Sequence, residues 1–398
     1  MADVNRSNGG QARRAAHAGA NLPVLRGHNA ALVLDLLRTA GEGGISRLEL
    51  AERTGLTPQA VSKITARLRT EGLAAEAGRR ASTGGKPRTV LRLVPSAAHA
   101  VGLHLDRDEL TAVLVDLAGT PVAVRSVPLD LGTGTERVVE AAAAQVAAVR
   151  AAAVTTAQVR TAEVRTAGAV RPDTASGAGG LLGVGVAMPG PLDHATGVPR
   201  RVTGFPRWDG FPLRDVLADR LGLPVVLDKD TNAAALGLSL RDPGDSFAYL
   251  HLGTGLGAGL VLGGVLHRGE RTGAGEFGHQ VIQLDGPGCD CGNRGCVEAL
   301  CLAAVARGDL AEAARVLGTG AANLVGLLDI DRVLLGGRTI TANEECFVRG
   351  VGAVVAGRAP GAVIPVTVAG GGAHTVAEGA AQLVLAPVFG HRRGPELA

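Results

Sequence analysis

The feature that most constrains this chain is a cluster of metal-type ligands, because three of its five cysteines lie within eight residues and a histidine precedes them. These residues are His279, Cys289, Cys291 and Cys296. Zinc binds four such ligands in a tetrahedron, and this spacing supplies them from one loop. Redox or buried thiols are alternatives, but neither needs Gly292 and Gly295 between the ligands. The sequence predicts a structural zinc loop over residues 279–296.

The length of 398 residues predicts two or three domains. A hydrophobic content of 46% is enough for a core, while only 2% aromatic residues and 59 glycines favour tightly packed α/β layers. No apolar run approaches the ~20 residues that a membrane helix needs. Residues 1–11 are polar and the cysteines are clustered, so we expect no signal peptide and a cytoplasmic location.

The small net charge of +3 hides an asymmetry along the chain. Residues 1–95 hold 15 Lys/Arg against 7 Asp/Glu, a net of +8, and the remainder holds 25 against 30, a net of −5. A basic head on an acidic body is typical of a head that meets a polyanion. Solubility also explains a short basic segment, so charge alone does not decide.

Helix signals organise the basic head. Residues 1–20 are expected to form a flexible tail, and Asn29 to cap a first helix. Ser46 and Glu49 form a capping box for a second helix that ends near Gly55. Thr57 followed by Pro58 predicts the start of a third helix. Two short helices joined by a glycine-containing turn indicate a helix-turn-helix.

The third helix is expected to bury Val61, Ile64 and Leu68 and to present a small, polar and basic outer face. A basic segment at residues 79–88, before a strand at 89–94, predicts a wing that touches phosphates or the minor groove. A protein-docking module is the alternative, but caps, turn, outer face and wing together favour DNA binding. The expected DNA contacts are Thr57, Gln59, Ser62, Lys63, Arg67, Lys86 and Arg88.

Beyond a linker near residue 95, the pattern changes to apolar strands and alanine-rich helices, which predicts an α/β body. A helix is expected at residues 136–150, and residues 151–180 are expected to extend it into a mobile loop. Strands are expected at residues 101–105, 111–117, 182–187, 225–227, 248–252, 257–262 and 333–335. Turns follow these strands, and ligands of α/β sheets bind beyond the carboxyl ends of strands.

These turns, with Glu-x-Gly-His at residues 276–279 and Cys-x-Cys-Gly-x-x-Gly-Cys-x-Glu at residues 289–298, resemble the ROK family of repressors and sugar kinases. The resemblance covers roughly residues 24–390 and implies an actin-like ATPase fold of two α/β lobes. The N-terminal winged helix-turn-helix is similar to that of the repressor branch, such as the xylose repressors. The resemblance as a whole implies a DNA-binding domain at residues 21–95, a first lobe at residues 99–225 and a second lobe at residues 226–390.

The resemblance also implies a sugar site between the lobes. Asp230 matches the family's catalytic base, and Glu276, His279 and Glu298 match ligands of sugar hydroxyls. His279 is expected to serve metal and sugar with one ring nitrogen each. Gly190, in the turn at residues 188–191, is expected to line the same site.

Two departures from the kinase pattern stand out. Where kinases of the family have Asp-x-Gly-Gly-Thr, this chain has His104 in place of the aspartate and Asp106, Arg107 and Asp108 in place of the Gly-Gly-Thr. Phosphate needs close backbone N–H groups and no like charge, so we expect no kinase activity. Lys229 replaces an asparagine. Either the pocket takes an anionic sugar derivative, or this lysine pairs with a neighbouring carboxylate, at residue 228, 230 or 276.

The sequence therefore predicts a regulator that binds operator DNA as a homodimer or homotetramer and senses a carbohydrate effector, with structural zinc and no membrane partner. An ATP-dependent sugar kinase with an appended DNA-binding head is the alternative from another class. A third hypothesis is a constitutive DNA-binding protein whose sensor has decayed.

Overall fold

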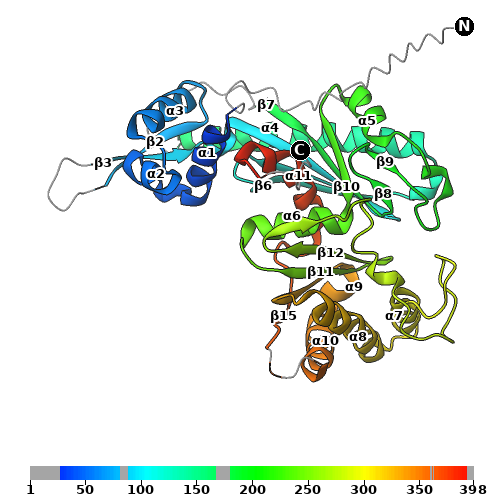
Figure 1. The fold of residues 1–398 in the computed structure, drawn as a ribbon. Coiled ribbons are helices and arrows are strands. Elements are labelled where there is room, and N and C mark those ends of the chain that lie inside the picture. Colours follow the sequence, from blue (N-terminus) through cyan, green and yellow to red (C-terminus); the bar gives the residue numbers. More distant parts are fainter. Residues whose placement is uncertain (1–26, 81–87, 167–179, 359–360, 362, 392–398) are drawn as a thin grey trace, which may run out of the picture.

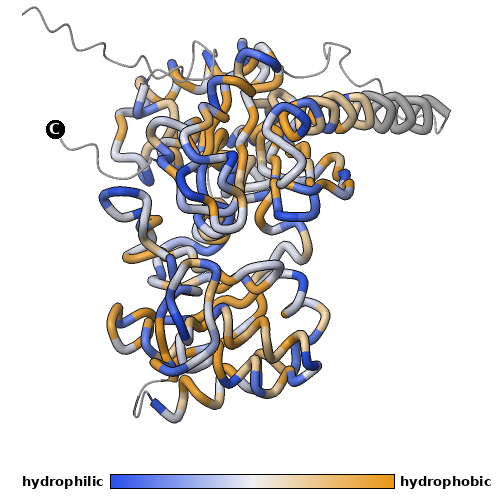
Figure 2. The backbone as a smooth tube through the Cα atoms, turned by 90° about the vertical axis from the view of Figure 1, so that its right-hand side faces the viewer, coloured by the Kyte–Doolittle hydropathy of each residue, from blue (hydrophilic) through white to orange (hydrophobic). Residues whose placement is uncertain are grey.

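The computed structural model describes residues 27–80, 88–166, 180–358, 361 and 363–391. A small N-terminal head precedes two lobes, each built on a five-stranded sheet (Figure 1). Seen from the side, the two lobes lie one above the other, with hydrophobic stretches of chain running through each (Figure 2). Across the described residues, no helix combines the length and apolar character that a membrane crossing requires.

The head is a winged helix-turn-helix. Its helices are α1 (His28–Ala40), α2 (Arg47–Thr54) and α3 (Pro58–Thr70), and its strands are β1 (Ile45–Ser46), β2 (Ala74–Arg80) and β3 (Arg88–Leu93), in the order β1-β3-β2. Both sides of the predicted capping box form at α2, and the Thr57 side chain caps α3. The prediction for Asn29 was wrong, because α1 begins one residue earlier and the carbonyl of Gly27 accepts its first hydrogen bonds.

Helix α3 has the two faces that its sequence predicts. Val61 and Leu68 are fully buried, whereas Ile64 is only partly buried. The predicted outer face is exposed at Thr57, Gln59, Ser62, Lys63 and Arg67. Arg88 is exposed at the start of β3, where its backbone pairs with that of Arg80. Lys86, the tail at residues 1–20 and residues 167–179 of the predicted mobile insert lie outside the described residues.

The first lobe is a mixed sheet in the order β10-β7-β4-β5-β6. Its strands are β4 (Ala98–Leu105), β5 (Glu109–Asp116), β6 (Pro121–Pro128), β7 (Gly180–Met188) and β10 (Val225–Lys229). Helices α4 (Thr135–Thr166) and α5 (Leu213–Leu221) pack on one face, and α11 (Thr375–Leu385) covers the other. Because β10 pairs with β7 and α11 returns from the end of the chain, this lobe extends past the expected boundary at residue 225.

The second lobe has a sheet in the order β13-β12-β11-β14-β15. Its strands are β11 (Phe247–Leu252), β12 (Leu256–Leu262), β13 (Val265–His267), β14 (Arg332–Gly336) and β15 (Val366–Val368). Helices α7 (Val297–Ala306), α8 (Leu310–Leu328) and α10 (Glu344–Arg358) share one core with this sheet. On its other face lies α6 (Asp230–Arg241), so α6 and α11 are both packed between the two sheets.

Short elements complete the described chain. They are β8 (Leu192–Asp193), β9 (Val198–Pro199), α9 (Arg338–Thr341) and the 3-10 turns η2 (Gly41–Gly43), η3 (Pro95–Ala97), η4 (Leu131–Thr133), η5 (Pro206–Trp208), η6 (Phe277–His279), η7 (Gly372–His374) and η8 (Ala386–Phe389). The predicted hairpin of β11 and β12, and the strand that leads into Gly336, are present.

Candidate functional site

A cavity of about 70 Å³ lies between the two lobes, at the carboxyl ends of several strands. All five residues that the resemblance implied for the effector line this cavity: Gly190, Asp230, Glu276, His279 and Glu298. Ligand pockets usually measure about 300–1,000 Å³. The enclosed part of this cavity is therefore small, and the rest of the space between its lining residues is open to solvent.

Asp230 lies where β10 ends and α6 begins, so a rigid strand and a rigid helix fix its backbone. Burial raises the pKa of the Asp230 carboxyl to about 7, the Thr231 N–H lowers it, and the negative charges of Asp106 and Glu276 raise it further. A carboxyl group with a pKa near neutrality can accept a proton from a bound hydroxyl or donate one to it.

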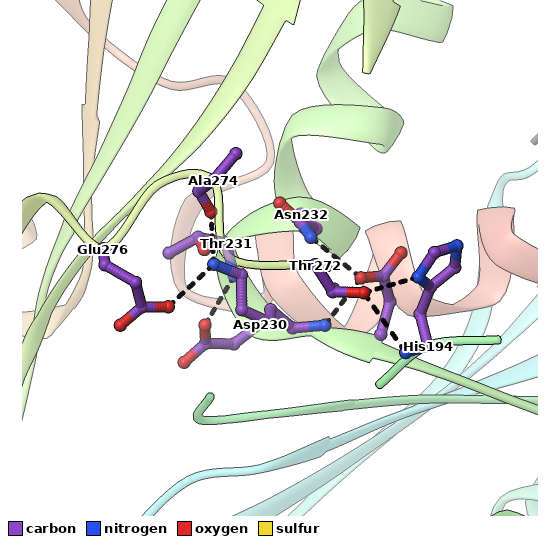
Figure 3. Close-up of polar contacts among 9 residues, drawn as sticks. His194, Asp230, Thr231, Asn232, Thr272, Ala274 and Glu276 are labelled. Carbon is purple, nitrogen blue, oxygen red and sulfur yellow. Dashed lines mark hydrogen bonds and ion pairs between the residues drawn. The ribbon is translucent and has the colours of Figure 1, made fainter. Parts of the chain in front are cut away.

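Lys229, one residue earlier, pairs within the protein. Its ammonium group donates to Glu276 Oε1 at 3.0 Å and to the carbonyl of Ala274, and its side chain is 3% exposed. Both of these partners are labelled in Figure 3. Of the three carboxylates expected as partners, Glu276 is therefore the one that Lys229 meets. The lysine stem lies against Gly190, where a Cβ would come within 2.7 Å of Lys229 Cδ.

The loop that carries Glu276, residues 268–276, is held at two further points. Arg268 forms a buried ion pair with Asp228, with 2.7 Å between Nε and Oδ2. Thr272 Oγ1 lies 2.7 Å from Nδ1 of His194, which belongs to the first lobe (Figure 3). These partners were not expected from the sequence, because they lie 40 and 78 residues apart and no motif joins them.

Glu298 closes another side of the cavity. It is buried in the first turn of α7, and its Oε2 accepts the N–H of Leu256 at 2.7 Å. The start of β12 and the end of the cysteine-rich loop are thereby fixed to one carboxylate.

The His/Cys cluster has the geometry of a metal site. The candidate ligand atoms of His279, Cys289, Cys291 and Cys296 all lie within 4.8 Å of one another. The Cys291–Cys296 Sγ separation and the Cys289 Sγ–His279 Nδ1 separation are both 3.7 Å. Ligands at about 2.3 Å in a tetrahedron are about 3.8 Å apart, so a zinc-sized ion fits this donor set.

Loop geometry brings these ligands together. Gly295 has φ 66°, and a Cβ there would overlap the carbonyl of Gln283, so only glycine fits beside Cys296. His279 turns Nδ1 toward the cysteines and also lines the cavity, which leaves Nε2 as the ring nitrogen for a second partner.

The acidic turn between β4 and β5 pairs with a basic side chain of the other lobe. Arg338, at the start of α9, lies 2.6 Å from Asp108 Oδ1 and 3.7 Å from Asp106 Oδ2. Thr254 Oγ1 donates to Asp106 at 2.9 Å. The sequence indicated the acidic turn but not the approach of Arg338, because nothing local shows that these two segments meet.

Buried histidines lie beside this turn. Burial lowers the pKa of His104 and, together with the neighbouring His104, lowers that of His251 to about 4. Both imidazoles are therefore neutral at pH 7. His104 stands where kinases of the family have an aspartate. Because Mg²⁺ prefers oxygen ligands, a neutral imidazole nitrogen at this position would bind magnesium poorly.

A family profile described as ROK family matches residues 127–306, and one described as winged helix-turn-helix DNA-binding matches residues 33–74. The chain is similar to the xylose repressor of Bacillus subtilis strain 168, with 29% identity over 257 residues, which are 64% of this chain and 61% of that protein. It thus spans about three fifths of the length of the curated relatives that it matches first.

Two solved structures are also similar. A ROK hexokinase from Thermus thermophilus is 30% identical with a TM-score of 0.52, over 71% of this chain and 96% of that one. A ROK family transcriptional regulator, a homolog of the E. coli MLC protein, has a TM-score of 0.69 at 20% identity, over 92% of this chain and 98% of that one. At 20% identity, the similarity to this regulator shows a shared fold, which includes the N-terminal head.

We predict that Asp230→Asn stabilises the protein more at pH 8 than at pH 5. An aspartate whose pKa is raised to about 7 from 3.8 holds its proton when folded, so its ionisation costs folding free energy as the pH rises between these values. The full shift corresponds to at most about 4 kcal/mol. Thermal unfolding at both pH values measures it, with the exposed Asp219→Asn as control. An equal Tm difference at both pH values would contradict the prediction.

Proposed function

Because this chain belongs to the ROK family, we propose that it is a sugar-responsive transcriptional repressor that binds operator DNA through its N-terminal head. The observation that carries the proposal is that a head with an exposed polar and basic helix is joined to a two-lobed body whose acidic turn pairs with Arg338. The first feature suits DNA, and the second disfavours a nucleotide. The similar xylose repressor supports the same reading.

In the proposed complex α3 enters the major groove. Gln59, Ser62 and Lys63 face the bases, Thr57 and Arg67 lie at the flanks, and the wing with Lys86 and Arg88 touches the backbone. A two-fold operator needs two heads, so we propose a homodimer or a pair of homodimers as the binding species. Operator DNA also implies the cytoplasmic location expected from the sequence.

The proposed effector is a neutral sugar rather than an acidic one. The cavity is lined by four carboxylates and two basic side chains, Arg107 and Lys229, and Lys229 is already paired with Glu276. An anionic ligand would add to the negative excess. Sugar hydroxyls, by contrast, are well matched by the free oxygens of Asp230, Glu276 and Glu298.

Metal at the His/Cys cluster is proposed to be structural zinc. The three thiolates and His279 Nδ1 fill four positions, so no open position remains for a reacting group. Bound zinc would supply rigidity: it would fix the cysteine-rich loop and the ring of His279, whose Nε2 then faces the effector.

We expect Lys63→Ala and Arg88→Ala to weaken operator binding at least about fivefold, because each removes a cation from the DNA-facing surface. A gel-shift titration against the DNA upstream of the protein's own gene, at fixed moderate salt, measures this. Arg349→Ala is the control, since Arg349 is exposed on α10 of the second lobe. A specific complex that these head variants leave unchanged would contradict the proposed interface.

The alternative is an ATP-dependent sugar kinase, which the 30% identity to a solved ROK hexokinase and the position of Asp230 favour. We expect no ATP turnover with hexoses, pentoses or amino sugars in a coupled assay, because aspartates replace the glycines whose N–H groups would approach phosphate, and these aspartates are paired with Arg338 of the other lobe. Thermal shifts on the same panel should show stabilisation by a neutral sugar without ATP. Turnover that Asp230→Asn abolishes would establish the kinase instead, and stabilisation by no sugar would favour a decayed sensor.

Metal analysis of the purified protein should give about one zinc per chain. Cys291→Ser removes one of four ligands and should lower that content severalfold, whereas Cys346→Ser, outside the cluster, should not. Equal zinc in both variants, or none in the wild type, would exclude a structural zinc site.

A further inference from the structure

The last helix of the chain, α11, touches both lobes at backbone distance. On one side it lies on β4 and β7, where a Cβ on Gly102 would overlap the carbonyl of Ala377 and one on Gly185 that of Ala380. On the other side it meets α6, where a Cβ on Gly379 would overlap the carbonyl of Ala233. Figure 1 shows α11 between the first sheet and α6. The backbone of α11 is in contact with the first sheet on one side and with α6 on the other. Helix α6 therefore has little room to move without displacing α11.

Helix α6 is also a wall of the effector cavity. Its first residues, Asp230 and Thr231, line the cavity directly. Near its other end, Arg241 forms an ion pair with Glu378 of α11. A ligand that displaces Asp230 therefore pushes on a helix that is fixed to α11 along its length.

At its C-terminal end, α11 leads into the head. The buried ring of Phe389, in η8, lies under the guanidinium of Arg38 in α1, at 5.1 Å. His391 Nε2 lies 3.3 Å from Asp35 Oδ1, and Asp35 also pairs with Arg38 at 2.6 Å. One continuous core contains residues of α1, α11 and η8, including Leu34, Leu37, Leu385, Val388 and Phe389.

From these contacts we propose that residues 375–391 form the docking surface for α1 through which occupancy of the effector cavity repositions the DNA-binding head. The proposal rests on the proposed function for its output, operator binding. Its physical basis is independent of that function: cavity, α6, α11, η8 and α1 are successive close-packed elements, and the covalent linker near residue 95 is not the only connection between head and body.

The test uses the full-length protein and a change at the contact of α6 with α11. In Gly237→Ala the new Cβ would lie 3.0 Å from Gly379 Cα, so the two helices must shift. Gly326→Ala on α8 is the matched control, because its Cβ meets open space. Hydrogen–deuterium exchange of α1, without DNA or sugar, should change about 3- to 30-fold in Gly237→Ala and stay unchanged in Gly326→Ala.

A double-mutant cycle then tests the route. In a Phe389→Ala background, where α1 is no longer docked on the aromatic ring, Gly237→Ala should no longer alter the exchange of α1. His391→Ala, which removes only a partly exposed ring, replaces Phe389→Ala if the latter does not fold. Arg241→Ala likewise replaces Gly237→Ala. Circular dichroism identifies such failures.

The outcomes separate this inference from the proposed function. Unchanged α1 exchange in Gly237→Ala, or an equal change with and without Phe389, overturns the inference even if the protein binds operator DNA. A change in α1 exchange that Phe389→Ala abolishes supports it, even if no operator complex forms and the proposed function fails. If operator DNA is bound, Gly237→Ala should also alter that affinity about threefold or more, and the control should not.

Discussion

The close contact of α6 and α11 between the two sheets is the constraint on which the rest of this structure depends. Glycines in β4, β7 and α11 remove the side chains that would hold these backbones apart. Both sheets thereby share one layer of two helices, and the cavity opens where the first of those helices begins. Asp230 lies at the start of one helix of this layer, and α1 packs at the end of the other.

Ion pairs between protein side chains hold the walls of the cavity together. Lys229 meets Glu276, Asp228 meets Arg268, and Arg338 meets Asp106 and Asp108. Each pair ties a segment of the second lobe or its loops to the end of a strand in the first. Arg268, Asp228 and Lys229 are buried, and burying such charges costs desolvation energy that the pairing only partly returns, so these pairs fix a geometry more than they add stability. Arg338 and Asp108 are about half exposed, and an exposed pair adds little stability.

The pairing of Arg338 also gives the departure from the kinase pattern a structural meaning. The turn between β4 and β5 has aspartates in place of glycines. Without a partner, these aspartates would give the cleft excess negative charge. Here the other lobe supplies the compensating cation, so the two lobes are joined by protein groups at that turn. In the proposed regulator, a sugar then changes the arrangement of the lobes without a nucleotide. That change reaches the DNA-binding head through contacts between packed elements rather than through a reaction.

Local patterns in the sequence determined much of this protein. The capping box at Ser46, the cap at Thr57, the two faces of α3 and the spacing of His279 with its cysteines depend on residues close together in the chain, so they could be predicted. The motif at residues 276–298 likewise predicted the family and the cavity wall.

Other features were decided only by the tertiary structure. The partner of Lys229, the contact of Arg338 with the acidic turn, the assignment of β10 to the first sheet and the return of α11 to the first lobe and the head all join residues far apart in the chain. No periodicity or spacing encodes such contacts, because they depend on how whole sheets and helices pack. Asn29, a residue type that often caps helices, is not the cap of α1, because that helix begins at His28 and its N-cap is Gly27.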